Sequence, residues 1–168
     1  GTEVFFLHGN RDFLIGEEFA HRTGCQLLPD PVVIKPDSLR ILLTHGDALC
    51  TDDLEHQASR QQMLSGKWKM AFLERPLPER MATANALRQK SELGKQTKPE
   101  AIMDVNQQAV EDLMRSHQVN IMIHGHTHRP AAHEFYLDGE RARRFVLGDW
   151  YEQKSAIYYE NGRLVLRR

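Results

Sequence analysis

Three short strings place histidine beside glycine at the end of an apolar run. The apolar runs lie at residues 4–7, 39–43 and 119–123, and their lengths are typical of buried strands. The strings that follow them are His8-Gly9-Asn10-Arg11-Asp12, His45-Gly46-Asp47 and His124-Gly125-His126-Thr127-His128. Because sites in α/β proteins lie outside the carboxyl ends of the strands, we expect the three strings to meet at one edge of a sheet.

The chemistry expected at that edge is metal binding, with Asn10, His45, His126 and His128 as candidate ligands. Residues two apart on an extended chain point to the same side, so His126 and His128 should converge, with Gly125 allowing a tight turn. Imidazoles with an amide oxygen suit Mn²⁺, Fe²⁺, Co²⁺ or Zn²⁺ better than Ca²⁺ or Mg²⁺. The alternative is a chance group of histidines in a polar loop, and His45 alone could be a structural residue.

The hydrophobic pattern predicts an α/β fold of two packed mixed β-sheets flanked by helices, an αββα sandwich. Strands are expected at 4–7, 32–34, 39–43, 119–123, 133–137, 144–147, 155–159 and 164–166. Helices are expected at 13–22, at 52–73 with a break at 65–66, at 79–93 and at 99–117. Asp138-Gly139 and Asn161-Gly162 are typical of hairpin turns, so the last part should be an antiparallel meander.

Residues 52–98 differ in character and are expected to form a helical insertion. Between residues 60 and 98 there are nine Lys or Arg against three Glu, a net charge of +6 in a chain whose total is −1. Basic and apolar groups on short helices suit a membrane surface or an anionic amphiphile, and Trp68 and Phe72 are expected to contribute to that contact. The alternative is a plain helical hairpin packed on the core, with a solvated basic face.

Length and composition limit the remaining possibilities. The 168 residues are enough for one domain, 1–168, with its own core. The net charge of −1 gives no general indication of nucleic-acid binding, and no run approaches the roughly 18 apolar residues of a membrane span. Cys25 and Cys50 lack metal-type spacing, so thiols in a reducing compartment are the simplest interpretation.

The strings resemble the closing half of the calcineurin-like metallophosphoesterase pattern, which contains Gly-Asn-Arg-Asp and Gly-His-Thr-His. Within that superfamily, the strings at 8–13, 45–53, 102–107 and 124–130 are similar to those of the UDP-2,3-diacylglucosamine diphosphatase family of the lipid A pathway. The resemblance covers residues 4–150. It implies hydrolysis of the pyrophosphate bond of UDP-2,3-diacylglucosamine, giving UMP and 2,3-diacylglucosamine 1-phosphate.

The resemblance also implies cofactors, partners and roles. Two divalent metal ions, Mn²⁺ in this interpretation, would be held by the four candidate ligands, and the 52–98 segment would be a helical lid over the acyl chains. The residues that would contact the substrate are Asn10, Arg11, Asp53, Arg88, Ser91, Lys98 and His126. The expected setting is the cytoplasmic face of the bacterial inner membrane, where a peripheral monomer would bind a nucleotide-lipid and no nucleic acid.

Arg11 is the expected catalytic residue. Most metallophosphoesterases have His at this position, where it is usually assigned to help the leaving group depart. A leaving phosphate monoester is already a stable anion with a second pKa of about 6. Arg cannot act as an acid near neutral pH, but it binds phosphoryl oxygens in a bidentate way. Arg11 therefore favours cleavage of a pyrophosphate over an alkyl phosphodiester; the alternative is a surface ion pair with Asp12.

Two rival functions follow from the same residues. One is a metallophosphodiesterase acting on nucleotides or nucleic acid, for which an apolar lid has no purpose. The other is a non-catalytic scaffold that uses this fold for protein binding, against which the intact Asn10, His45, His126 and His128 argue.

A two-metal site needs a bridging carboxylate, and we expect that this chain lacks it. Asp12 and Asp47 follow their strings and are expected to orient ligands rather than bind metal. The resembling family has Asp-x-His and Gly-Asp strings before Gly-Asn-Arg-Asp, and residues 1–7 contain neither. We therefore expect that N-terminal strands are missing, and that the chain binds at most one metal ion and hydrolyses nothing at a useful rate.

Overall fold

The chain forms two compact units in the computed structural model, which describes residues 1–168 apart from the side chain of Lys95. One unit combines residues 1–49 with residues 107–168 and contains all the strands. The other unit, residues 50–106, is helical. The 52–98 segment therefore lies within a unit of its own.

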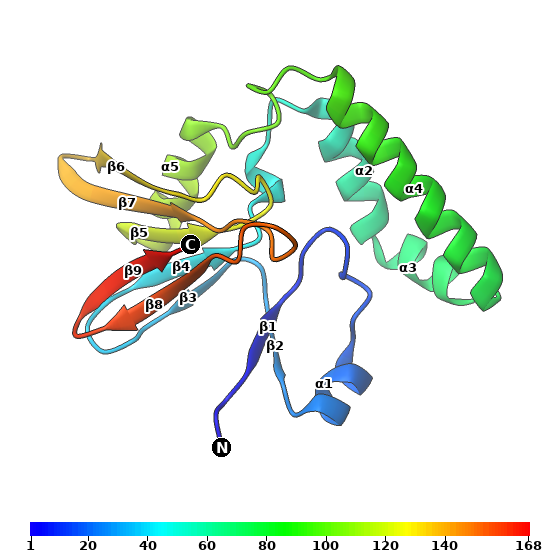
Figure 1. Cartoon of the computed structure of the whole chain (residues 1–168), viewed down its shortest axis with the longest axis horizontal. Coiled ribbons are helices and arrows are strands. Elements are labelled where there is room, and N and C mark those ends of the chain that lie inside the picture. The colour runs from blue at the N-terminus through cyan, green and yellow to red at the C-terminus, as the bar shows by residue number, and fades with distance from the viewer. The chain divides into compact units, whose positions relative to one another are not determined.

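A mixed five-stranded sheet is the centre of the first unit (Figure 1), with the strand order β3-β4-β5-β7-β6. The strands are β3 (Val32–Ile34), β4 (Ile41–Thr44), β5 (Ile121–His124), β6 (Ala131–Leu137) and β7 (Glu140–Val146). β4, β5 and β7 run parallel to one another, so their carboxyl ends lie at the same edge. This arrangement brings the ends of β4 and β5 together, as the strings at 45 and 124 predict.

The two faces of this sheet are covered differently. On one face, Ile41, Ile121 and Phe145 form a buried cluster with Leu164, which belongs to the hairpin of β8 (Ala156–Glu160) and β9 (Arg163–Arg167). Side chains alternate between the faces of a strand, so Leu42 and Met122 point to the opposite face. That face has the helix α5 (Gln107–His117) beside it (Figure 1).

Leu42 and Met122 are completely buried, as are Val110 and Met114 of α5. The resulting layers of helix, sheet and smaller sheet confirm the predicted α/β architecture with packed sheets.

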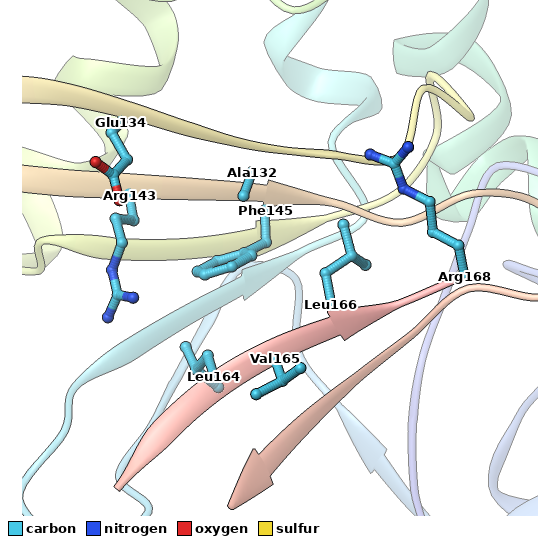
Figure 2. A pocket seen from close by; sticks show the side chains of 8 residues that line it. All are labelled: Ala132, Glu134, Arg143, Phe145, Leu164, Val165, Leu166 and Arg168. Atoms are coloured by element: carbon cyan, nitrogen blue, oxygen red, sulfur yellow. The ribbon is translucent and has the colours of Figure 1, made fainter.

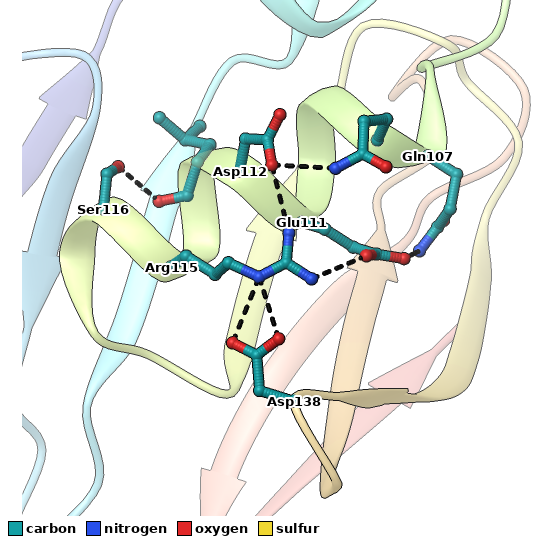
Figure 3. A network of polar contacts seen from close by, with 8 residues as sticks. Gln107, Glu111, Asp112, Arg115, Ser116 and Asp138 are labelled. Atoms are coloured by element: carbon teal, nitrogen blue, oxygen red, sulfur yellow. Dashed lines mark hydrogen bonds and ion pairs between the residues drawn. The ribbon is translucent and has the colours of Figure 1, made fainter.

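Charged contacts hold α5 to the turn between β6 and β7. Arg115 Nε donates to both carboxylate oxygens of Asp138, at 3.0 and 3.1 Å, while its two terminal nitrogens contact Glu111 and Asp112 at 3.0 Å (Figure 3). Asp138 and Gly139 both have positive φ, 51° and 87°, which is the backbone form of a tight two-residue hairpin turn. The Asp-Gly prediction is thus confirmed, and Asn161-Gly162 does the same between β8 and β9 with φ of 50° and 76°.

A cleft of about 680 Å³ opens between β6–β7 and the β8–β9 hairpin. Phe145, Leu164 and Leu166 form its apolar wall, and Arg143 and Arg168 lie toward opposite ends (Figure 2). None of the candidate site residues lines this cleft.

The first residues form a small β–α–β element. β1 (Phe5–Leu7) pairs in parallel with β2 (Gln26–Leu28), and α1 (Glu17–Thr23) connects them. The predicted helix 13–22 is wrong at its start, because residues 11–14 form turns and Gly16 caps the helix. β2 was not predicted, because a segment of three residues is too short to show the alternation that distinguishes a strand from a loop.

The helical unit contains α2 (Leu54–Leu64), α3 (Gly66–Leu73) and α4 (Leu77–Thr97). Asp53 and Ser65 cap α2 and α3 by accepting the N–H of His56 and Trp68, so the predicted break at 65–66 is confirmed. The Trp68 and Phe72 rings stack at 4.8 Å with an interplanar angle of 12°, and Phe72 is buried. The predicted helix 99–117 is wrong in its first half, because α5 begins only at Gln107.

Within the described residues, no helix combines the length and apolar character needed to cross a membrane.

Candidate metal centre

His45 and His126 come from adjacent parallel strands and lie side by side. β4 and β5 are paired so that Thr44 is opposite His124, which brings the loops that follow them together. The Gly125 N–H donates to the His45 carbonyl oxygen at 3.0 Å. The His45 and His126 rings are 5.1 Å apart between centroids and are inclined at 71°. The predicted convergence of the second and third strings is therefore observed for these two residues.

One nitrogen of the His45 ring has no hydrogen-bond partner among the described residues. This atom, Nε2, is buried. Burial lowers the pKa of His45, because a charged ring loses hydration, although the carboxylates of Asp47, Asp30 and Asp12 act in the opposite direction. A neutral imidazole with an unused nitrogen is the form that binds a divalent transition metal.

The string that carries Asn10 and Arg11 packs directly against His45. A Cβ atom built on Gly9 would lie 3.0 Å from His45 Cε1 and 3.2 Å from Nδ1, so only glycine fits without a shift. The Gly9 N–H donates to the carboxylate of Asp12, and His8 Nε2 contacts the Ile15 carbonyl oxygen at 2.6 Å. These bonds fix the loop, which has Asn10 half-buried and Arg11 exposed.

The loop after β5 does not have the extended form that the sequence suggested. His126 and His128 both have positive φ, 63° and 54°, and Thr127 N–H donates to the Gly125 carbonyl oxygen at 2.7 Å. The argument from residues two apart on an extended chain is therefore wrong here, because the strand ends at His124 and the chain curls. Non-glycine residues in this region cost on the order of 1–3 kcal/mol each and cluster at functional sites.

His128 lies toward Asp149, a residue that the sequence argument missed. His128 Nδ1 is 3.7 Å from Asp149 Oδ2, and Asp149 Oδ1 accepts the N–H groups of residues 151–153. The hydrogen bond from the Glu152 N–H is the main reason that the pKa of Asp149 is lowered. Asp149 follows the end of β7, so the strand-end rule that found the other strings could also have found it.

The four predicted ligands thus belong to one end of one unit, but they do not form a finished site. Across the residues that the structure describes, no group of three His, Cys, Asp or Glu side chains is arranged to hold a metal ion. The donors themselves fit a divalent transition metal, because the set combines imidazole nitrogens with an amide oxygen and the Nε2 atom of His45 has no hydrogen-bond partner among the described residues. Asp47 is buried, and its carboxylate accepts the Ala48 N–H at 2.9 Å, so its orienting role stays a prediction.

The four other predicted substrate contacts lie in the helical unit. Lys98 Nζ is 2.8 Å from both carboxylate oxygens of Asp53, and this pair joins the start of α2 to the end of α4. Arg88 and Ser91 are exposed on α4, and their spacing of three residues puts them on one face. Lys98 follows Ser91 by seven residues, two helical turns, so it continues the same face.

The chain matches the family model described as calcineurin-like phosphoesterase over residues 1–130. It belongs to this family.

Relatives with a more specific name match nearly the whole chain. It is 51% identical to a UDP-2,3-diacylglucosamine hydrolase of Aromatoleum aromaticum over 95% of this chain and 65% of that protein. The corresponding enzymes of Aeromonas salmonicida and Bordetella pertussis are 49% and 48% identical, over 96% and 88% of this chain and 64% and 57% of their own lengths. The chain therefore spans less than two thirds of the length of these relatives.

Proposed function

We propose that this protein hydrolyses the pyrophosphate bond of UDP-2,3-diacylglucosamine, releasing UMP and 2,3-diacylglucosamine 1-phosphate for lipid A synthesis. The observation that carries the proposal is the identity of about one half to enzymes of that name, which extends over both units of the chain. A phosphoesterase that shared only the strand-end strings would match the first unit alone.

Asn10, His45, His126 and His128 would hold the metal, for which Mn²⁺ is our proposal. Two ions are the number expected in an enzyme of the relatives' full length, which this chain spans only in part. A bound divalent ion supplies Lewis acidity at the phosphoryl group and lowers the pKa of water. The chain's own contribution is to favour the neutral form of His45 by burial and to leave its Nε2 atom without a hydrogen-bond partner among the described residues. These features favour a softer divalent ion over Mg²⁺ or Ca²⁺.

Arg11 would act on the substrate rather than as an acid. It is exposed on the loop that packs against His45, so its guanidinium can reach a phosphoryl group bound beside that histidine. A guanidinium stays charged at all physiological pH values and matches two phosphoryl oxygens at once. The Arg11 guanidinium would offset the negative charge that grows on those oxygens during bond cleavage.

The helical unit would bind the rest of the substrate. Arg88 and Ser91 lie one turn apart on α4, and Lys98 follows the end of that helix. Two cations and a hydroxyl suit a phosphate and a sugar. Asp53 orients the Lys98 ammonium by accepting from it with both oxygens.

We also propose a peripheral location on the cytoplasmic face of the inner membrane. The corner between α3 and α4 exposes Met70, Leu73, Leu77 and Met81, each with 49–64% of its surface accessible. The basic residues of the corner are Lys67, Lys69, Arg75 and Arg80. Exposed apolar groups among lysines and arginines fit an anionic lipid surface. We further propose that the protein is a monomer and binds no nucleic acid.

The test is release of UMP with Mn²⁺, measured by chromatography against time, by the enzyme at the full length of its relatives, because residues 1–168 alone are expected to bind at most one ion. UDP-2,3-diacylglucosamine is the substrate, while UDP-N-acetylglucosamine and bis(p-nitrophenyl) phosphate are the comparison compounds. Faster turnover of the lipid nucleotide than of both others is expected. Preference for the simple diester would instead identify a phosphodiesterase of hydrophilic substrates.

A further inference from the structure

The first histidine of the 124–128 string is built into the protein in a different way from the other two. His124 is the last residue of β5 and has only 1% of its surface exposed. Its Nε2 atom is 2.9 Å from Nη1 of Arg144, a buried residue of β7. Its Nδ1 atom is 2.9 Å from the carbonyl oxygen of Gly125. Both ring nitrogens are therefore engaged within the protein.

These two contacts determine where the proton of His124 lies. A guanidinium can only donate, so Nε2 of His124 must be the acceptor in the contact with Arg144. The ring proton is then on Nδ1, which donates to the Gly125 carbonyl oxygen. In this tautomer no lone pair is left for a metal, and the ring connects Arg144 rigidly to the loop that carries His126.

Gly125 is held from both sides by these bonds. Its carbonyl oxygen accepts from the His124 ring and from the Thr127 N–H, at 2.9 and 2.7 Å. Its own N–H donates to the His45 carbonyl oxygen at 3.0 Å. The peptide groups that precede His126 are thus fixed relative to His45, which explains how His126 keeps a positive φ beside the His45 ring.

The loop after β4 packs closely against the His124 ring. Gly46 has φ of 103°, and a Cβ atom built on it would lie 2.8 Å from Nδ1 of His124. A side chain at position 46 would have to displace the ring from its bond to Gly125. The ends of β4, β5 and β7 are therefore all joined at His124.

We infer that His124 and Arg144 are positioning residues that hold His126 and His45 in their mutual orientation. The inference depends on the proposed function only in so far as these two histidines serve a divalent metal. Partners that orient metal ligands typically contribute 10–100-fold to metal affinity. Arg144 therefore acts through two intermediates, the His124 ring and the Gly125 peptide.

The first test needs no variant. Long-range ¹H–¹⁵N correlation spectra of the metal-free protein, labelled with ¹⁵N-histidine, distinguish the two neutral tautomers. We expect the Nδ1–H form for His124. Finding the Nε2–H form would overturn the inference, because Arg144 would then have no acceptor there.

The second test measures Mn²⁺ affinity by the EPR signal of the free ion, with no substrate present. Arg144→Met should raise the apparent Kd by about 10–100-fold, and Arg144→Lys should recover part of that loss. The matched control is Arg143→Met, the neighbouring residue on β7, whose guanidinium lies over the Phe145 ring on the other face. An affinity in Arg144→Met equal to that of the control would overturn the inference.

These readouts are independent of the proposed reaction. If the protein fails to release UMP but Arg144→Met still loses Mn²⁺, the positioning role stands and the proposed substrate is wrong. If Arg144→Met does not fold, the tautomer measured in the unmodified protein still decides the question.

Discussion

The ammonium of Lys98 lies 2.8 Å from both carboxylate oxygens of Asp53, so one ion pair joins the two ends of the helical unit. Asp53 also caps α2, and Lys98 is the first residue after α4. Both side chains are mostly buried, with 10% and 22% of their surfaces exposed. Two residues that the sequence assigned to substrate contact therefore also hold the unit together.

Replacing Lys98 should cost stability as well as substrate binding. In Lys98→Met the Asp53 carboxylate stays buried without its cation, and we expect the free energy of unfolding to fall by roughly 1.5–3 kcal/mol. Urea denaturation followed by circular dichroism measures this loss. Lys90→Met is the matched control, because its pair with Glu55, at 3.4 Å, is exposed and should contribute less than about 1 kcal/mol. Equal losses in the two variants would contradict the buried pair.

The same pair predicts how this stabilisation depends on pH. Burial opposes the charge of Asp53, but the hydrogen bonds from Lys98 and the His56 N–H outweigh it and lower the pKa below the ordinary 3.8. Burial also disfavours the charged form of Lys98, but the hydrogen bonds to the Asp53 carboxylate and its negative charge outweigh burial and raise the pKa of Lys98 above the ordinary 10.5. A carboxyl group whose pKa is lowered by folding stabilises the folded state above its unfolded-state pKa, and this stabilisation is lost as the pH falls through the folded-state pKa. An amine whose pKa is raised by folding stabilises the folded state below its unfolded-state pKa, and this stabilisation is lost as the pH rises through the folded-state pKa.

The difference in unfolding free energy between wild type and Lys98→Met should therefore be constant from about pH 5 to pH 9. Below about pH 4 it should shrink as Asp53 becomes protonated. A difference that grows in acid would show that Asp53 is not the partner.

His45 should be essential for turnover without being essential for folding. The ring is half-buried at the end of β4, and Nε2 has no hydrogen-bond partner among the described residues to lose. In an enzyme of the relatives' full length, we expect His45→Ala to lower UMP release by more than about 100-fold, beyond the effect of an orienting residue. His21→Ala, an exposed histidine of α1, is the control. Activity near that of the control at equal Mn²⁺ would remove His45 from the site.

The α3–α4 corner, rather than the stacked rings, should determine membrane binding. The double variant Leu73→Ser with Leu77→Ser should bind vesicles containing phosphatidylglycerol at least about 10-fold more weakly, as measured by sedimentation. The reason is that burial of each leucine side chain in the lipid contributes roughly 1.5–3 kcal/mol to binding. Leu54→Ser is the control. Leu54 is equally apolar and more exposed than Leu73 or Leu77. It lies away from the corner, because it follows Asp53, and Asp53 contacts Lys98 at the other end of α4, about 30 Å along that helix. Equal loss in the control would mean that the corner has no special role.

The strand-end site could be predicted from the sequence because its logic is topological. Parallel strands finish at one edge, so apolar runs that end in His and Gly indicate which loops meet, and His45 and His126 do meet. The position of each side chain could not be predicted in this way. His126 and His128 have positive φ, and Gly125 is held by bonds to His124 and His45, features that sequence spacing does not encode.

The helices show the same limit. The break at 65–66 was predictable because Ser65 is a local cap, and a cap depends only on its neighbours. The start of α5 was not, since residues 99–106 contain apolar positions at helical spacing but form turns. Trp68 and Phe72 were expected to contact a membrane surface, but Phe72 is buried within the helical unit. Composition alone could not predict that burial.

Residues 1–168 should bind no more than one divalent ion, and only weakly. A two-metal site needs a carboxylate that bridges both ions, and among the described residues no group of three His, Cys, Asp or Glu side chains is arranged to hold even one. Asp12 accepts the Gly9 N–H, Asp47 accepts the Ala48 N–H, and Asp149 accepts three backbone N–H groups. Titration with Mn²⁺, followed by EPR and native mass spectrometry, should give one ion per chain at most. The variant His45→Ala with His126→Ala should abolish that binding, which would locate the ion. Two tightly bound ions in the unmodified chain would show that one of these carboxylates leaves its backbone partner to bridge them.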